Sequence, residues 1–404
     1  MVRNEKREFL LLANSQNHIL IMKNKVVTTM ISAAAFAGAA YAGEVVAEQP
    51  QPTAESHTCD ALKSLGKLYK DDSNPFIQEV KFFGRGQFQY GYVDGSEESE
   101  GYSEWRRVRL GAQVKFAKFF DVMLRANLEN GGRNDHNFEF GGYDEAKVGV
   151  NLGKAFGIDS FDKVYLSYGR DKIEIGEDVH TSSKKIKTVE RTALTGKIRP
   201  DNSTGFALSL EKGDWKGAVG VFSADEGDDE VLFDDFSSEK FFYATSTFGL
   251  TGGDLIVDLI INPDADEVDS DYRNNWATSV AYRTEVFDWD LALNAVLGDE
   301  EEDGLFYGLV VQPSKYIIED KLEIVGRYYF QASDNESGIK PNSRVSSKAL
   351  GGSGDMHHSV YAGLNYYLCG HNAKLVTGIE YEALDTPDGG NNATTLWGAF
   401  RFYF

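Results

Sequence analysis

The chain has 404 residues, of which 42% are hydrophobic and 13% aromatic. Its 63 acidic residues outnumber its 41 lysines and arginines, and the formal net charge of −22 argues against a nucleic-acid partner. From residue 43 onward, no stretch reaches the roughly 18 uninterrupted apolar residues that are typical of a membrane helix. With 41 glycines and 8 prolines, the composition favours a strand-rich protein with many tight turns.

The amino end has the features of an export signal. Met22 begins a short basic stretch, residues 26–38 are small and apolar, and Ala40-Tyr41-Ala42 matches a cleavage site. We therefore predict that residues 1–42 are a leader and that the true start is Met22. The alternative is a buried helix over residues 26–42.

Residues 43–78 are predicted to be a linker followed by a short helix. The polar residues 43–58 are typical of a disordered segment. A helix is expected over residues 59–70, where Leu62, Leu65 and Leu68 share one side. Because so short a helix is unstable alone in water, it needs a surface to rest on.

Residues 79–404 repeat one unit, an alternating segment followed by a polar or glycine-rich break. In residues 107–116, for example, every second residue from Val108 to Phe116 is apolar. A period of two predicts β-strands. The sixteen predicted strands lie near residues 79–92, 104–116, 121–130, 143–152, 162–171, 204–211, 215–224, 239–249, 254–262, 275–285, 289–297, 304–312, 321–331, 358–369, 374–383 and 393–404.

The breaks alternate between short ones, such as 117–120, and long ones, such as 93–103 and 172–203. Short turns at one end and long loops at the other are typical of outer-membrane barrels and not of β-sandwiches. The final strand agrees, since Phe400, Phe402 and Phe404 lie on the face opposite Arg401. We predict an all-β fold, a single transmembrane antiparallel β-barrel of about 16 strands, embedded in outer-membrane lipid of a bacterium with both termini in the periplasm. The alternative is a soluble all-β protein.

The only two cysteines of the chain are Cys59 and Cys369. Cys59 belongs to the periplasmic segment, and Cys369 precedes a short turn that the strand parity also places in the periplasm. An exported protein can form disulfides. We hypothesise a Cys59–Cys369 bond that ties the segment to the barrel floor; the alternative is two free thiols.

Basic side chains recur on the predicted lumen face of three neighbouring strands. A cationic wall selects anions, and the arginine fork can grip two phosphate oxygens. In the alternative, these cations pair with lumen carboxylates such as Glu129 and Glu145 and brace the wall. The wall residues are Arg107, Arg109, Lys115, Arg125 and Lys147.

The break over residues 172–203 is long enough to suggest a function of its own. It is basic, whereas breaks such as 95–100 and 225–230 are acidic. Folded into the lumen, it forms a cationic constriction. The residues expected there are Lys184, Lys185, Lys187 and Arg191.

Several motifs in order along the barrel together resemble the phosphate-selective porins. They are Trp105-Arg106-Arg107-Val108-Arg109-Leu110-Gly111, the strand Asp121–Glu129, Tyr168-Gly169-Arg170, Thr181-Ser182-Ser183 and Glu190-Arg191. The resemblance covers roughly residues 80–404. It implies a sixteen-stranded homotrimeric porin that passes anions beside lysines and arginines.

The chain departs from this family at one place. The family has Pro-Phe-Gly after the fifth strand, where this chain has Ile173-Glu174-Ile175-Gly176. Acidic Glu174, Glu177 and Asp178 add negative charge near the expected constriction.

The expected function is passive diffusion of small hydrophilic solutes with a preference for anions, phosphate among them. No enzymatic activity, cofactor or metal site is expected, because the sequence shows no phosphate-cradling glycine loop, nucleophile elbow or zinc spacing. The alternatives are a general or cation-preferring porin and a structural barrel that anchors the envelope through residues 43–78.

Overall fold

The structure is a computed structural model. It describes residues 54–404 except 130, 131, 135, 226, 233–235, 237, 238, 268, 269 and 342–345. Residues 55–404 form one compact unit. The predicted leader over residues 1–42 and the first part of the linker lie outside the described residues.

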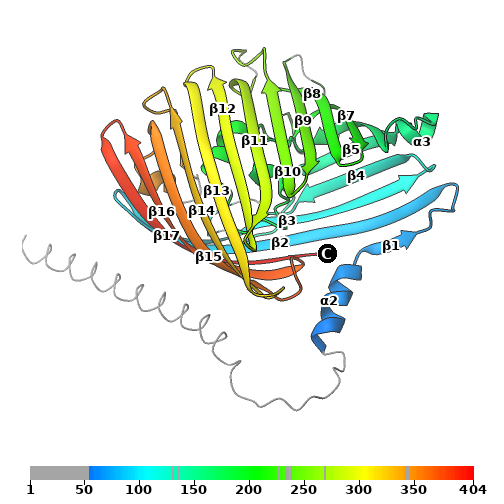
Figure 1. Cartoon of the computed structure of the whole chain (residues 1–404), viewed down its shortest axis with the longest axis horizontal. Coiled ribbons are helices and arrows are strands. Elements are labelled where there is room, and N and C mark those ends of the chain that lie inside the picture. Colours follow the sequence, from blue (N-terminus) through cyan, green and yellow to red (C-terminus); the bar gives the residue numbers. More distant parts are fainter. Residues whose placement is uncertain are drawn as a thin grey trace, which may run out of the picture. The chain divides into compact units, whose positions relative to one another are not determined.

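Sixteen strands, β2 to β17, form a closed antiparallel barrel (Figure 1), which confirms the predicted fold class. Each strand pairs with its neighbours in sequence, and β17 pairs with β2 to complete the ring. The strands are β2 (Ile77–Gly95), β3 (Ser99–Phe116), β4 (Phe120–Asn127), β5 (Tyr143–Asn151), β6 (Lys163–Asp171), β7 (Ser203–Lys212), β8 (Trp215–Ser223), β9 (Lys240–Leu250), β10 (Gly253–Ile261), β11 (Asn274–Val286), β12 (Trp289–Glu300), β13 (Gly304–Ile318), β14 (Leu322–Ser333), β15 (Met356–Tyr367), β16 (Ala373–Thr386) and β17 (Gly389–Tyr403).

The two faces of the wall differ as the alternation predicts. On β15, Val360 and Leu364 are 52% and 45% exposed, whereas Ser359 and Tyr361, on either side of Val360, are 1% and 2% exposed. An outward apolar face suits lipid, and an inward polar face suits a lumen. The side-chain period of two therefore fixes which residues reach the interior.

The prediction of a long break over residues 93–103 is wrong. β2 runs to Gly95 and β3 begins at Ser99, so a tight turn joins them. The two strands form seventeen cross-strand pairs, from Ile77–Phe116 to Asp94–Ser99. The alternation in fact continues here, because Val93 and Tyr102 are buried while Asp94 and Gly101 are exposed, so the polar residues extend the hairpin.

The predicted helix over residues 59–70 is also misplaced. Helix α2 spans Ala54–Ser64, and Lys67–Lys70 form strand β1, which pairs with β2. Gly66 between them has φ 93°, a conformation that suits glycine at a helix end. Its carbonyl accepts a 2.7 Å hydrogen bond from Phe82 N, so the chain turns onto β2 at this point.

Four further helices are short: α3 (Leu152–Phe156), α4 (Glu177–His180), α5 (Ala193–Ile198) and α6 (Ser346–Ala349). Helix α3 was not predicted; Asn151 caps it by accepting a 2.9 Å bond from Lys154 N. Within the described range, every helix is too short or too polar to cross a membrane.

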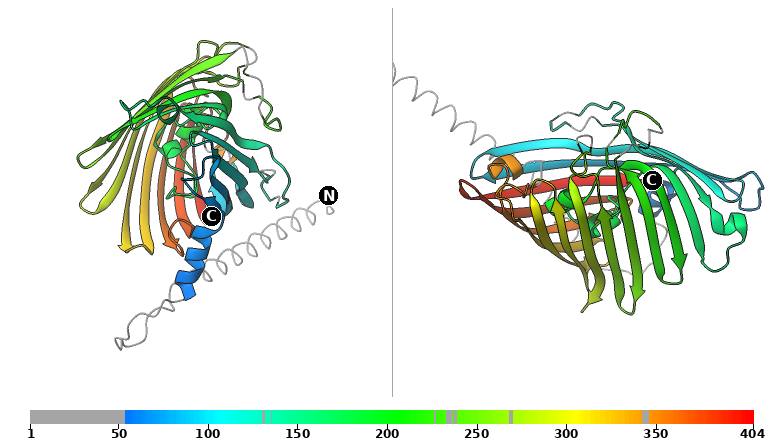
Figure 2. Two further views of the ribbon diagram at one scale, coloured as in Figure 1. Left: turned by 90° about the vertical axis from the view of Figure 1, so that its right-hand side faces the viewer. Right: turned by 90° about the horizontal axis from the view of Figure 1, so that it is seen from above.

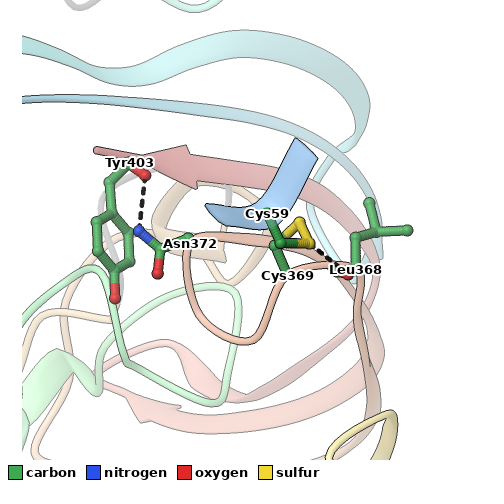
Figure 3. The surroundings of a disulfide bond; sticks show 5 residues. All are labelled: Cys59, Leu368, Cys369, Asn372 and Tyr403. Atoms are coloured by element: carbon green, nitrogen blue, oxygen red, sulfur yellow. Dashed lines mark hydrogen bonds between the residues drawn. A yellow bond between two sulfur atoms is a disulfide. The ribbon is translucent and has the colours of Figure 1, made fainter. Parts of the chain in front are cut away.

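A disulfide joins α2 to the turn between β15 and β16 (Figure 3). Cys59 and Cys369 are bonded, with Cα atoms 5.2 Å apart. In the same turn, Asn372 Nδ2 donates to Tyr403 O at 3.1 Å, and Tyr403 N donates to Asn372 O at 2.9 Å. The barrel closes where β17 pairs with β2, and this junction is here called the seam. The segment from Cys59 to β1 is bonded to the β15–β16 turn at one end and paired with β2 at the other, so it spans the end of β17 and the seam.

Loss of this disulfide is expected to weaken the seam. Cys59→Ser and treatment with reductant should each lower the unfolding temperature of the purified barrel, consistent with the roughly 2–4 kcal/mol that a disulfide contributes. The measurement is the temperature at which the compact band on a detergent gel converts to the unfolded band.

The double variant Cys59→Ser/Cys369→Ser serves as the control, and reductant should not affect it. Equal transition temperatures for the reduced and oxidised native chain would contradict a stabilising role for the bond.

Candidate functional site

Residues 172–202, here called the lumen loop, fold into the barrel between β6 and β7 (Figures 1 and 2). Helices α4 and α5 belong to this loop. Its apolar side chains are buried, with Ile173, Ile175 and Val189 all at 0% exposure. They join a cluster that includes Tyr243 and Tyr361 of the wall. Burial of these side chains favours a fixed loop in the lumen over one in solvent.

The first half of the loop is held by polar side chains of β10 to β12. Asp258, which is fully buried, accepts bonds from Gly176 N at 2.9 Å and from His180 Nε2 at 2.8 Å. Asn294 accepts a 3.0 Å bond from Glu177 N, and Arg283 Nε forms a 2.9 Å ion pair with Glu177. These contacts fix helix α4 against the wall.

The second half of the loop is held by buried cations of β14, β16 and β17. Lys374 Nζ donates to Ile186 O at 2.7 Å. Arg401 donates to Ile186 O at 3.2 Å and also to Val189 O. Arg327 donates to Glu190 O at 2.8 Å. The loop backbone therefore lies directly against cationic side chains.

Three of the wall positions form one row across neighbouring strands. Arg107 on β3 is opposite Gln87 on β2, Gln87 is opposite Arg401 on β17, and Arg401 is opposite Lys374 on β16. Adjacent strands are only about 4.8 Å apart, so these three cations lie close together. Arg85, two residues along β2 from Gln87, donates to Ser183 of the loop.

The acceptors that surround these cations are mostly uncharged. Arg107 donates to the Gln87 side chain at 3.0 Å, and Lys374 and Arg401 donate to backbone carbonyls. Arg85 bonds a serine hydroxyl. Among the described residues, none of the four forms an ion pair with a carboxylate. A neutral acceptor satisfies the hydrogen bond but does not cancel the charge, so these four side chains are not neutralised by their hydrogen-bond partners.

Two of the predicted wall residues are neutralised. Arg109 Nη2 lies 2.8 Å from Asp144 Oδ1. Arg125 forms ion pairs with both Asp144 and Glu145. These arginines brace β3, β4 and β5, which is the alternative that the sequence left open.

The two predicted wall lysines are paired as well. Lys147 Nζ lies 2.5 Å from Asp171 Oδ1. Lys115 lies near the short-turn end of β3, half exposed, with its Nζ 2.7 Å from Glu79. The structure therefore does not bring Lys115 together with the lumen loop, and Arg107 alone of the five wall residues has no carboxylate partner in the described chain.

The predicted loop residues divide in the same way. Lys187 is paired, with Nζ 2.7 Å from Glu323 and 2.8 Å from Asp290. Lys184 lies over the Tyr403 ring, 4.7 Å from its centroid, and Lys185 is exposed. Both have no ion pair with a described carboxylate.

Arg191 is bound like the wall cations. It donates to the carbonyls of Asp178 at 2.7 Å and Thr181 at 3.0 Å. Asp178 is occupied by Thr192 and Thr195, whose hydroxyls donate to it at 2.8 Å. The acidic departure from the family pattern is thus used to fold the loop, and Arg191 keeps its charge.

Sequence reasoning missed Arg106, because a bulge interrupts the alternation. Gln87 pairs with Arg107 and Phe88 pairs with Trp105, so Arg106 is the extra residue on β3. Its Nε reaches Glu190 of the loop at 2.8 Å. One feature of the sequence could have revealed it. In a regular strand, consecutive residues such as Arg106 and Arg107 face opposite sides, so both can reach the lumen only if a bulge interrupts the strand.

Loss of the hydrogen bonds that hold the lumen loop against the wall should widen the channel. Arg401→Met removes two bonds to the loop carbonyls, and an unpaired buried carbonyl costs about 1–3 kcal/mol. We expect a higher and noisier single-channel conductance in KCl.

Arg273→Met is the matched control, since Arg273 also donates to two carbonyls, at 3.1 and 3.2 Å, but in the loop after β10. Identical conductance traces for Arg401→Met and the native channel would rule out this role of Arg401.

Comparison with known proteins agrees with this architecture. The family of phosphate-selective porin O and P matches residues 80–245. A search of curated proteins gave no match.

Solved porins share the fold at low sequence identity. The anion-selective porin of Comamonas acidovorans is 12% identical with a TM-score of 0.51, over 81% of this chain and 99% of that one. OmpF of Salmonella typhi, in complex with daunomycin, is 12% identical with a TM-score of 0.53, over 83% and 100%. OmpT of Vibrio cholerae is 12% identical with a TM-score of 0.51, over 84% and 100%.

These solved structures support the fold, and the family match adds the kind of activity, which is that of a channel. The chain is therefore a porin of the bacterial outer membrane, and its predicted resemblance to the phosphate-selective porins is confirmed over residues 80–245.

Proposed function

We propose that this porin passes small hydrophilic solutes with a preference for anions, phosphate among them. The observation that carries the proposal is the set of lumen cations without a carboxylate partner in the described chain. Four of them are on the wall and four on the lumen loop. They are Arg85, Arg107, Lys374, Arg401, Lys184, Lys185, Arg191 and Arg199. Lumen charges of one sign select ions of the other.

The names of related proteins point in the same direction. The matching family is described as phosphate-selective, and one porin of the same fold is described as anion-selective. The resemblance also leads us to expect a homotrimer surrounded by outer-membrane lipid.

A cation-preferring channel is the second candidate. The net charge of −22 favours it, as do exposed acidic residues such as Glu174, which is 47% exposed beside Lys172. The sign of the reversal potential under a KCl gradient separates the two candidates, and a sign that favours potassium would refute the proposed preference.

Charge reversal in the loop tests the residues involved. Lys184→Glu/Lys185→Glu should shift the reversal potential toward potassium and lower the chloride-to-potassium permeability ratio about tenfold, because lumen potentials amount to several kT. The measurement is the reversal potential in a planar bilayer, repeated with added phosphate.

Lys154→Glu/Lys321→Glu is the matched control, since both lysines are exposed at the short-turn end outside the lumen. If the two double variants behave alike, the loop lysines do not set selectivity.

Anion preference should fall at alkaline pH. Burial, together with the charges of Arg85, Arg125 and Lys81, lowers the pKa of Lys184 to about 8. Burial similarly lowers the pKa of Lys172 to about 8. A lysine is charged below its pKa and neutral above it, so selectivity should decline between pH 7 and pH 9.

Two arginine variants identify the group that titrates, because arginine stays charged over this range. Lys184→Arg should remove most of the decline, whereas Lys172→Arg should leave most of it, because Lys172 is already paired with Glu174. A decline that persists in Lys184→Arg would assign the titration to another group.

A further inference from the structure

A cavity of about 610 Å³ lies beside the lumen loop. It is lined by α5, by the bulge of β3 at Arg106 and Arg107, and by the loop after β14. Small-molecule sites typically have volumes of about 300–1,000 Å³. The cavity is therefore larger than a single inorganic anion requires. Its lining includes both arginines and carboxylates, which makes its chemistry more specific than that of a simple cationic ring.

Three arginines of the lining form no ion pair with a carboxylate among the described residues. Arg107 uses one donor on Gln87, and Arg191 bonds two backbone carbonyls. Arg199 donates to the Asn202 side chain, and its buried Nε has no hydrogen-bond partner in the described part of the chain. A guanidinium has five donors, so each retains capacity for an oxyanion. Paired donors of this kind suit the oxygens of a phosphate group.

Carboxylates line the same cavity as the arginines. Asp201 is exposed, and no hydrogen bond or ion pair of its side chain is found in the described residues. Glu300 and Asp303 share Lys197, whose Nζ lies 3.0 Å from Asp303. Free carboxylate oxygens accept hydrogen bonds from hydroxyl groups. They repel a small inorganic anion, so a site for phosphate alone gains nothing from them.

We propose that this cavity recognises phosphorylated, hydroxyl-rich organic solutes of the sugar-phosphate class. The arginines bind the phosphate group, and carboxylates of the same lining accept bonds from the solute's hydroxyl groups. Thr195 and Ser337 add hydroxyls to the same lining. The inference rests on the proposed anion preference and specifies the solute for which the lumen is built.

Block of the chloride current tests the proposal. Glucose 6-phosphate, inorganic phosphate and glucose are added in turn to the native channel in KCl. Glucose 6-phosphate should reduce the current at a half-blocking concentration about tenfold below that of phosphate, since about 1.4 kcal/mol of added hydrogen bonding corresponds to a factor of ten. Glucose should not block.

Two variants separate the parts of the site. Arg199→Gln should raise the half-blocking concentration of both phosphates about tenfold, because a charge-assisted bond is lost. Asp201→Asn should weaken block by glucose 6-phosphate but not by phosphate. Asp388→Asn, in the exposed turn between β16 and β17, is the control and should change neither.

Each other outcome has a definite meaning. Equal block by the two phosphates, or an unchanged glucose 6-phosphate block in Asp201→Asn, overturns the inference but leaves the anion preference intact. A reversal potential that favours potassium, with no block by either phosphate, overturns the proposed function as well.

Discussion

The contact between wall cations and the backbone of the lumen loop is the constraint on which the rest of the site depends. Lys374 and Arg401 fix the loop through the carbonyls of Ile186 and Val189. A carbonyl orients a cation without neutralising it, whereas a carboxylate does both. Where the structure uses carboxylates, as for Lys187 beside Glu323, the charge is cancelled. The choice of acceptor therefore decides which cations are neutralised by their partner and which are not.

The barrel could be predicted because its signal is local. A period of two and alternating break lengths follow from the covalent geometry of strands and from the lipid outside them. The partners of the lumen cations could not be predicted in this way. Arg327 donates to Glu190 O of the loop, 137 positions away in the sequence. The alternation along a strand gives the face on which a side chain lies, but not its height in the lumen or its partner. The bulge at Arg106 shows the further limit, because one extra residue changes the face that the pattern assigns.

In the amino-terminal segment, the predicted disulfide is present although the predicted bounds of the helix were wrong. The helix ends earlier than expected, at Ser64, because Gly66 directs the chain into β1. Strand parity nonetheless placed Cys59 and Cys369 at the same end of the barrel, and the structure bonds them. Phe404 N donates to Gly84 O at 3.1 Å, so the chain terminus, β2 and the bridged segment meet at one seam. The disulfide near this seam joins residues 310 positions apart, so it closes a long segment of the chain and restrains the unfolded state accordingly.

The negative net charge and a preference for anions are compatible because the two kinds of charge lie in different surroundings. Glu97 and Glu98 in the β2–β3 turn, and Asp228 and Glu230 in the loop after β8, are exposed to solvent at the long-loop end. Salt at physiological strength screens exposed charges beyond about 8 Å. Arg107 and Arg401, in contrast, are 7% and 2% exposed, so the ions that shield surface groups cannot surround them. The proposed anion preference depends on the few lumen cations that no carboxylate neutralises, so a negative sum over the whole chain does not contradict it.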